Sequence, residues 1–457
     1  MMLEPLKNKT YAALFSAQVI ALLGTGLTTV ALALLAFELA GDEAGQVLGT
    51  ALAIKMVAYV SLAPIAGGLA PLLPRRAYLI ALDLTRAGFV LCLPFVTEIW
   101  QIYALIFLLQ ACSAGFTPVF QATIPDIFED EAVYTKALSL SRLTYDLESL
   151  LSPALAAAAL LIVSFDALFA ANAVAFLISA ALVFTAQIGS SPPETAPEKL
   201  SGRFTFGLRA YLATPRLRGL LAMSMAVAAG GAMVIVNTVV YVQGTLALAE
   251  QWTAALMMAF GFGSMVAAFT LPRILRHFDD REVALSAGGA MSVALGLGVL
   301  TPGYWGAAVL WFTIGLGYSA VLVSAGRLLQ RSSTKPDRPA YFAAQFALSH
   351  LCFLITYPLA GWAGSAFGLP ATFAFFAALV LLSTAVAHRL WPSQDVRDLL
   401  HEHKALNHEH LHTHDAHHQH AHEGWEGPEP HSHPHRHAPI RHRHRFSIDQ
   451  HHTSWPR

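Results

Sequence analysis

Runs of twenty or more predominantly apolar residues recur along the chain, and they restrict the possible folds more than any other feature. Examples are residues 11–39, 99–121, 166–187 and 304–325. A helix that crosses a bilayer needs about 20 such residues. Hydrophobic types make up 55 % of the 457 residues and charged types 12 %, whereas a soluble domain carries about 25 % charged residues. The sequence therefore predicts an all-α membrane protein.

The apolar runs divide into two sets of six around a polar segment. The twelve predicted transmembrane helices cover residues 11–39, 46–70, 77–96, 99–123, 137–163, 166–187, 217–242, 251–272, 282–301, 304–326, 341–365 and 368–391. Proline, serine and charge between the sets are typical of a linker. We predict an N-terminal six-helix bundle (1–187), a cytoplasmic linker (188–216), a C-terminal six-helix bundle (217–391) and a disordered, His-rich cytoplasmic tail (392–457).

Basic residues fall on one side of this predicted membrane topology. Every loop on the same side of the membrane as the N-terminus contains lysine or arginine, and the loops on the opposite side contain neither. Because basic loops stay in the cytoplasm, both termini are expected there, in a multi-pass protein of the cell inner (plasma) membrane. The net charge of −1 indicates no nucleic-acid partner, and three scattered cysteines offer no disulfide framework.

The loop after the second predicted helix, Gly67-Gly68-Leu69-Ala70-Pro71-Leu72-Leu73-Pro74-Arg75-Arg76, carries a family resemblance. It resembles the major facilitator superfamily signature G-x-x-x-D-R-x-G-R-R: Gly67, Arg75 and Arg76 match, whereas Pro71 occupies the acidic position. The resemblance implies two six-helix bundles with alternating access, and a gating loop that contains Gly67, Arg75 and Arg76. The two halves also resemble each other, since Ser141-Arg142-Leu143 has a counterpart in Ser349-His350-Leu351.

Two further stretches, residues 117–126 and 137–149, together with the tail resemble the nickel-resistance (NreB-type) efflux permeases of this superfamily. The resemblance implies proton-driven export of nickel, or cobalt, from a bacterial cytoplasm. The substrate is then a divalent metal ion and the coupling ion a proton. We expect a monomer in the lipid bilayer.

The tail contains eighteen of the 21 histidines, between residues 401 and 452. Imidazole binds nickel, cobalt and zinc well, so we expect the tail to bind these ions, with no cofactor required for transport. The tail lies outside the membrane, so it cannot form the transport site, and a cytosolic metal buffer is the alternative role. The predicted metal ligands are His401, His403, His408, His410, His412, His414, His417, His418, His420, His422, His431, His433, His435, His437, His442 and His444.

Ionisable residues within the membrane are costly and are functional by default. Asp146, Glu148 and His350 are candidates for binding the metal or exchanging a proton, because metal ligands must be deprotonated. Further candidates for the transport pathway are Arg142, Asp83, Arg86 and Lys55. The pairs Asp83/Arg86 and Arg142/Asp146 share helix faces, and their alternative role is structural. The alternative for His350 is a hydrogen bond to a neighbouring helix.

Two other functions fit the same sequence. The first is a major facilitator exporter of an organic substrate (a siderophore or drug) with a metal-sensing tail, for which Phe107, Phe116, Phe262 and Phe346 allow an aromatic cavity. The second is a metal-storage or sensory membrane protein without transport. The sequence contains no nucleotide-binding GxxxxGK[ST] loop and no catalytic constellation, so it does not predict an enzyme.

Overall fold

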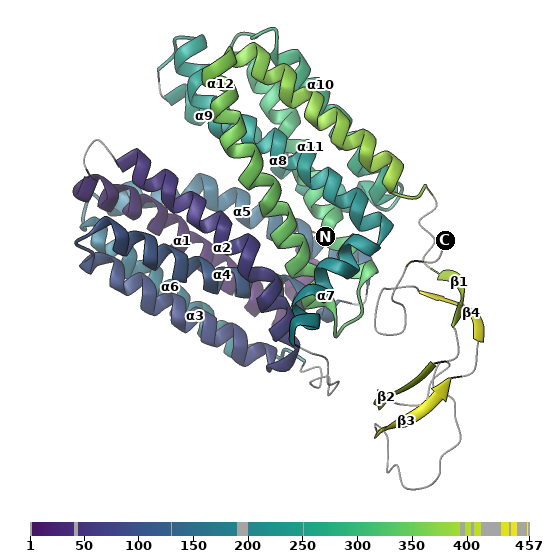
Figure 1. The fold of residues 1–457 in the computed structure, drawn as a ribbon. Helices are drawn as coiled ribbons and strands as arrows, with labels where there is room; N and C mark the ends of the chain where they lie inside the picture. Colours follow the sequence, from purple (N-terminus) through teal and green to yellow (C-terminus); the bar gives the residue numbers. More distant parts are fainter. Residues whose placement is uncertain are drawn as a thin grey trace.

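The computed structural model describes residues 2–40, 44–128, 130–189, 200–249, 251–393, 398–403, 406–412, 431–437 and 440–445, and Trp455. Two helical bundles form the membrane part (Figure 1). The first contains α1 (Lys9–Ala40), α2 (Ala44–Leu69), α3 (Arg75–Cys92), α4 (Ile99–Ile127), α5 (Glu131–Ala159) and α6 (Phe165–Thr185). The second contains α8 (Pro215–Val239), α9 (Gln251–Ile274), α10 (Asp280–Gly298), α11 (Tyr304–Ser332) and α12 (Arg338–Leu390). Between them lies α7 (Leu200–Ala213), within the predicted linker.

The long helix α12 makes two membrane passes. It contains 53 residues, or about 80 Å at 1.5 Å per residue, which is far more than a bilayer requires. Gly368 interrupts it with φ 76°, a left-handed conformation that glycine adopts without a steric penalty. Nine helices of the described chain are long and apolar enough to cross a membrane, with α12 counted once. The charge-bearing α5 and α10 complete the twelve predicted spans.

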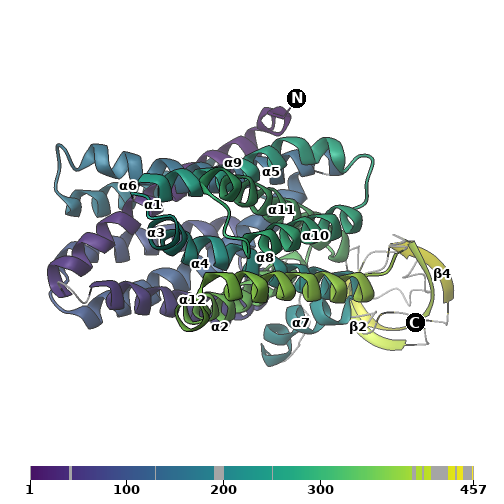
Figure 2. The same ribbon diagram turned by 90° about the horizontal axis from the view of Figure 1, so that it is seen from above.

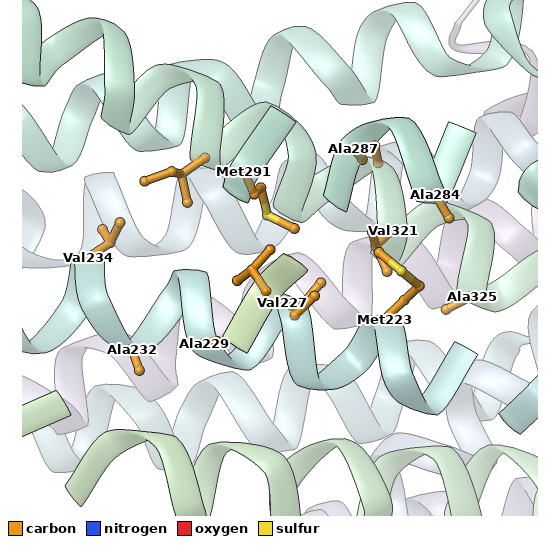
Figure 3. Packing of buried hydrophobic residues seen from close by; sticks show 14 of the residues in the cluster. Met223, Val227, Ala229, Ala232, Val234, Ala284, Ala287, Met291, Val321 and Ala325 are labelled. Atoms are coloured by element: carbon orange, nitrogen blue, oxygen red, sulfur yellow. The ribbon is translucent and has the colours of Figure 1, made fainter. Parts of the chain in front are cut away.

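Small and flexible side chains fill the core of the second bundle. Met223 of α8 and Met291 of α10 are fully buried, and Figure 3 shows them between Val227, Ala287 and the valine and alanine residues of α11. Small residues let helix backbones approach closely, and methionine adapts to the gaps that remain. The three helices therefore pack as one compact unit.

The two bundles approach each other at the end where α7 lies, which we call the linker end, and they diverge toward the opposite end (Figure 1). Two sets of helices form the interface: α2 packs against the first half of α12, and α5 packs against α9 and α11. Figure 2 shows α2 directly beside α12. The bundle interface is thus closed at the linker end.

The described parts of the tail differ from the expected disorder. β1 (Asp398–His403) pairs with β4 (Ile440–Arg445), and β2 (Leu406–His412) pairs with β3 (His431–His437), both antiparallel. The alternation of histidine with other residues has the period of two that a strand requires. The register places histidine opposite histidine at four positions: His401/His442, His408/His435, His410/His433 and His412/His431.

Candidate functional site

A charged cluster joins α5 of the first bundle to α9 and α11 of the second. Arg142 and Asp146, one helical turn apart, form an ion pair. Ser264 of α9 accepts a hydrogen bond from Arg142 Nε (3.1 Å) and donates one to Asp146 Oδ2 (2.7 Å). The Arg142 guanidinium also lies 5.1 Å from the ring centre of Tyr318. The predicted pair therefore exists, and it bridges the bundles rather than stabilising one of them alone.

A second polar cluster lies where α2 meets α12. Tyr59 of α2 donates a hydrogen bond to Gln110 Oε1 of α4 (2.7 Å), and Lys55 Nζ lies 5.6 Å from the Tyr59 ring centre. The His350 ring packs edge-on against Tyr59, with 4.8 Å between ring centres, and its centre lies 4.2 Å from that of the tilted Phe346 ring. His350 Nδ1 is 2.7 Å from the Phe346 carbonyl oxygen. That bond lies within α12, whereas the alternative for His350 was a bond to a neighbouring helix.

Glu148 belongs to neither cluster. It is half-buried on α5 and faces α1, where a Cβ atom at Gly26 would lie 3.0 Å from Glu148 Oε1. Glu148 therefore lies within the first bundle.

Asp83 and Arg86 of α3 form an ion pair inside the first bundle. Ser179 of α6 donates a hydrogen bond to Asp83 Oδ2 (2.8 Å). The Arg86 guanidinium lies between Phe116 and Phe176, 4.1 and 4.5 Å from their ring centres. None of these partners belongs to the second bundle, so this geometry supports the structural alternative for the pair.

We expect Arg86→Leu to destabilise the protein by about 3 kcal/mol, because it leaves a buried carboxylate without its cation. The double variant Asp83→Asn/Arg86→Leu removes both charges and should recover most of that loss. Thermal unfolding of the purified variants in detergent would measure both effects. A double variant as unstable as Arg86→Leu would contradict the ion-pair explanation.

The linker end of the interface carries an ion triad that joins the bundles. Arg75, the first residue of α3, and Arg338, the first residue of α12, both pair with Asp126 near the end of α4. Arg75 Nη2 also donates a hydrogen bond to the carbonyl oxygen of Lys335 (2.9 Å). A carboxylate from α4 thus supplies the negative charge in this region, although proline replaces the acidic residue of the signature loop.

A second triad lies beside the first. Asp280, the first residue of α10, pairs with Arg331 near the end of α11 (2.8 Å), and Arg331 also pairs with Glu131, the first residue of α5. Arg327, one turn earlier in α11, contacts both Glu131 and Asp280 at 2.8 Å. The ions therefore tie α5 of the first bundle to α10 and α11 of the second.

The two triads occupy equivalent positions with opposite charges. Positions 75 and 280, and positions 126 and 331, are each 205 residues apart. Each triad consists of the first residues of two helices and the penultimate residue of a third helix. The equivalent residues are Arg75 and Asp280, Asp126 and Arg331, and Arg338 and Glu131. Both triads must break if the bundles separate at the linker end, so together they form a candidate gate.

Of the three predicted gating residues, Gly67 and Arg75 lie at the interface between the bundles, and Arg76 does not. Arg75 enters a triad, and Gly67 lies against α12, where a Cβ atom would collide with Ala343. Arg76 instead points to α6, 5.4 Å from the Phe184 ring centre. The sequence interpretation assigned no gating role to Asp126, Glu131, Asp280, Arg327, Arg331 or Arg338. The charge-inverted spacing of 205 residues is a signal that could have identified Asp280 from Arg75 and Arg331 from Asp126, whereas Glu131 and Arg338 are 207 residues apart.

Among the side chains that the structure describes, no three histidine, cysteine, aspartate or glutamate residues are arranged to hold a metal ion. Sixteen histidines of the tail were predicted to bind metal, and the structure describes the side chain of none of them. For eleven it describes only the backbone, within strands β1 to β4. The other five lie outside the described residues: His414, His417, His418, His420 and His422. The candidate transport site of the described chain therefore consists of the two interface clusters and the gate.

Two helical bundles with polar and ionic contacts across their interface are the arrangement of a membrane transporter. The profile of the Major Facilitator Superfamily matches residues 14–312 and 251–426, which cover most of the chain. The protein belongs to the major facilitator superfamily.

Individual relatives are distant. An uncharacterized MFS-type transporter, YfiS of Bacillus subtilis (strain 168), is 28 % identical over 179 residues, which cover 39 % of this chain and 42 % of YfiS. The human organic anion transporter MFSD10 (TETRAN) has a TM-score of 0.73 at 11 % identity, covering 83 % of this chain and 99 % of MFSD10. A bacterial homologue of the iron transporter ferroportin, in an outward-facing state, has a TM-score of 0.68 at 14 % identity with the same coverages. These structures share the fold.

Proposed function

We propose that the protein exports divalent nickel, or cobalt, from the cytoplasm in exchange for protons and so confers metal resistance. The observation that carries this proposal is the concentration of eighteen histidines between residues 401 and 452, directly after the last membrane pass. Such a segment suits nickel, cobalt and zinc ions. The register of the described strands supports it, because histidine opposes histidine at four positions.

The proposed orientation places the linker end in the cytoplasm. Basic residues gather in the loops of this end, as the positive-inside rule requires. The bundles meet at the linker end and their helices diverge toward the other end (Figure 1), and the proposal takes this arrangement as the state in which the cytoplasmic side is closed. In alternating access, the gate opens to admit the metal ion from the cytoplasm, and it closes before the ion leaves.

Proton exchange is assigned to carboxylates and imidazole near the interface. Asp146 lies in the charged cluster that joins α5 to α9 and α11, and His350 lies in the polar cluster where α2 meets α12. Glu148 lies on α5 and faces α1. A proton that arrives from outside competes with the metal ion for such groups, because ligands must be deprotonated. Entry of the proton would therefore favour release of the metal. A homologue of an iron transporter with the same fold supports a metal ion as substrate.

An organic substrate is the second candidate, and one observation favours it. The α2–α12 cluster combines Lys55 with the rings of Tyr59, Phe346 and Phe353, and a cation beside aromatic rings suits an organic anion. Of the four phenylalanines named for an aromatic cavity, Phe346 belongs to this cluster, Phe116 contacts Arg86, and Phe107 and Phe262 are exposed. MFSD10, which shares the fold, is an organic anion transporter.

Metal accumulation separates the candidates. Cells that express the full chain, or a chain ending at Pro392, are loaded with nickel, cobalt, zinc or copper, and their metal content is measured. We expect both chains to lower cellular nickel or cobalt several-fold relative to cells without the protein, because the transport path lies within the bundles. Metal retained by the full chain and not by the shortened chain would identify a tail that only stores metal. The organic substrate would then become the first candidate.

A further inference from the structure

The start of the tail is fixed against the linker end of α8. Trp391, which ends α12, is only 1 % exposed. Its side chain covers Gly219 of α8, where a Cβ atom would lie 2.7 Å from Trp391 Cβ, and its carbonyl oxygen accepts a hydrogen bond from Arg281 Nε (3.0 Å). The chain therefore leaves the second bundle from a defined point.

Trp455, which follows the last histidine of the sequence, returns to the same place. It is half-buried against the hydrophobic core of the second bundle. Its ring centre lies 5.1 Å from the guanidinium of Arg216, a buried residue in the first turn of α8. Arg216 and Gly219 are three residues apart and so share a helix face. Both ends of the histidine-rich segment thus contact one turn of α8.

The strand order of the tail agrees with this return. β1 directly follows the second bundle and pairs with β4, while β2 pairs with β3, so the strands nest and the chain comes back on itself. Asp398 lies opposite Arg445 in this register. Trp455 is ten positions after Arg445, and an extended chain of that length reaches about 35 Å. Figures 1 and 2 show the strands beside the linker end of the second bundle.

We propose that Trp455 is an intramolecular anchor, and that the first turn of α8 is its docking site. An indole ring over a desolvated arginine gains cation–π attraction in addition to apolar burial. Docking closes the histidine-rich segment into a loop whose two ends meet at the linker end. The loop keeps the histidines at a high effective concentration beside the gate. The anchor itself is independent of which substrate the protein carries.

Distances between spin labels test the anchor in the full chain. One label is placed at Thr453→Cys and the other at the exposed Leu212→Cys of α7, with Cys92, Cys112 and Cys352 replaced. We expect a single narrow distance distribution in detergent and in lipid. Trp455→Ala should broaden it and move it to longer distances, whereas Trp455→Phe should largely retain it.

Trp425→Ala is the matched control, because it removes a tryptophan from the tail and leaves Trp455 and Arg216 in place, so the distribution should stay unchanged. A broad distribution in the parent chain would overturn the proposal. So would a narrow distribution that survives Trp455→Ala. Because metal transport is not measured, these results stand apart from the proposed export function.

Discussion

Asp126→Asn is expected to abolish transport and to open the linker end of the bundle interface. The substitution leaves Arg75 and Arg338, which both pair with Asp126, as neighbouring cations without their shared carboxylate. Loss of one partner of a buried ion pair costs about 3–5 kcal/mol, and every 1.4 kcal/mol changes an equilibrium about tenfold. The closed gate should therefore lose at least a hundredfold in its population relative to the open gate.

Reaction of a cysteine placed at Gly326 with a water-soluble thiol reagent, in a chain whose Cys92, Cys112 and Cys352 are replaced, measures this opening. Gly326 lies at the closed interface, where its carbonyl oxygen accepts a hydrogen bond from Tyr134, so the site should react only when the bundles separate. The same cysteine in an otherwise unchanged gate is the reference for any effect of the cysteine itself. Asp166→Asn, in the first turn of α6 at the opposite end, is the matched control. Equal reactivity in the Asp126 and Asp166 variants would contradict the gate.

Much of the fold could be predicted because each membrane-spanning helix needs about 20 apolar residues, a requirement that can be checked in its own sequence. Apolar length identified most spans, and the Gly368 break within α12 falls at the predicted boundary between residues 365 and 368. The Arg142–Asp146 and Asp83–Arg86 pairs were predictable as well, because partners three or four residues apart meet on one helix face. The predicted proton and metal roles of these residues stay predictions.

The gate could not be predicted by the same reasoning. Asp126 and Arg338 are 212 residues apart, and nothing in the local pattern of either helix end identifies its partner. The charge of Arg338 served to assign its loop to one membrane side, and its pairing with Asp126 was not considered. Only the three-dimensional repeat, with each charge of one half inverted in the other, makes the two triads recognisable. The Trp455 contact was missed for the same reason, since its partner Arg216 lies 239 residues earlier.

Asp146→Asn is expected to reduce nickel transport by more than tenfold under the proposed function. Arg142 would remain at the interface as a buried cation whose ion-pair partner has become neutral, and Ser264 would lose its charged acceptor. This single variant cannot separate a structural role from proton exchange, because an unpaired charge by itself destabilises the interface.

The double variant Arg142→Gln/Asp146→Asn separates the two roles. It removes both charges and retains hydrogen-bonding side chains beside Ser264, so the bundles should still meet and the protein should unfold at close to the parent temperature. If Asp146 exchanges protons, nickel flux into inverted vesicles should no longer respond to an imposed proton gradient, whereas the parent should accelerate several-fold. A double variant that keeps the full response would remove Asp146 from the coupling path and leave Glu148 and His350. Recovery of flux without recovery of the gradient response would assign the carboxylate to proton exchange, because the ion pair alone would then be dispensable for transport.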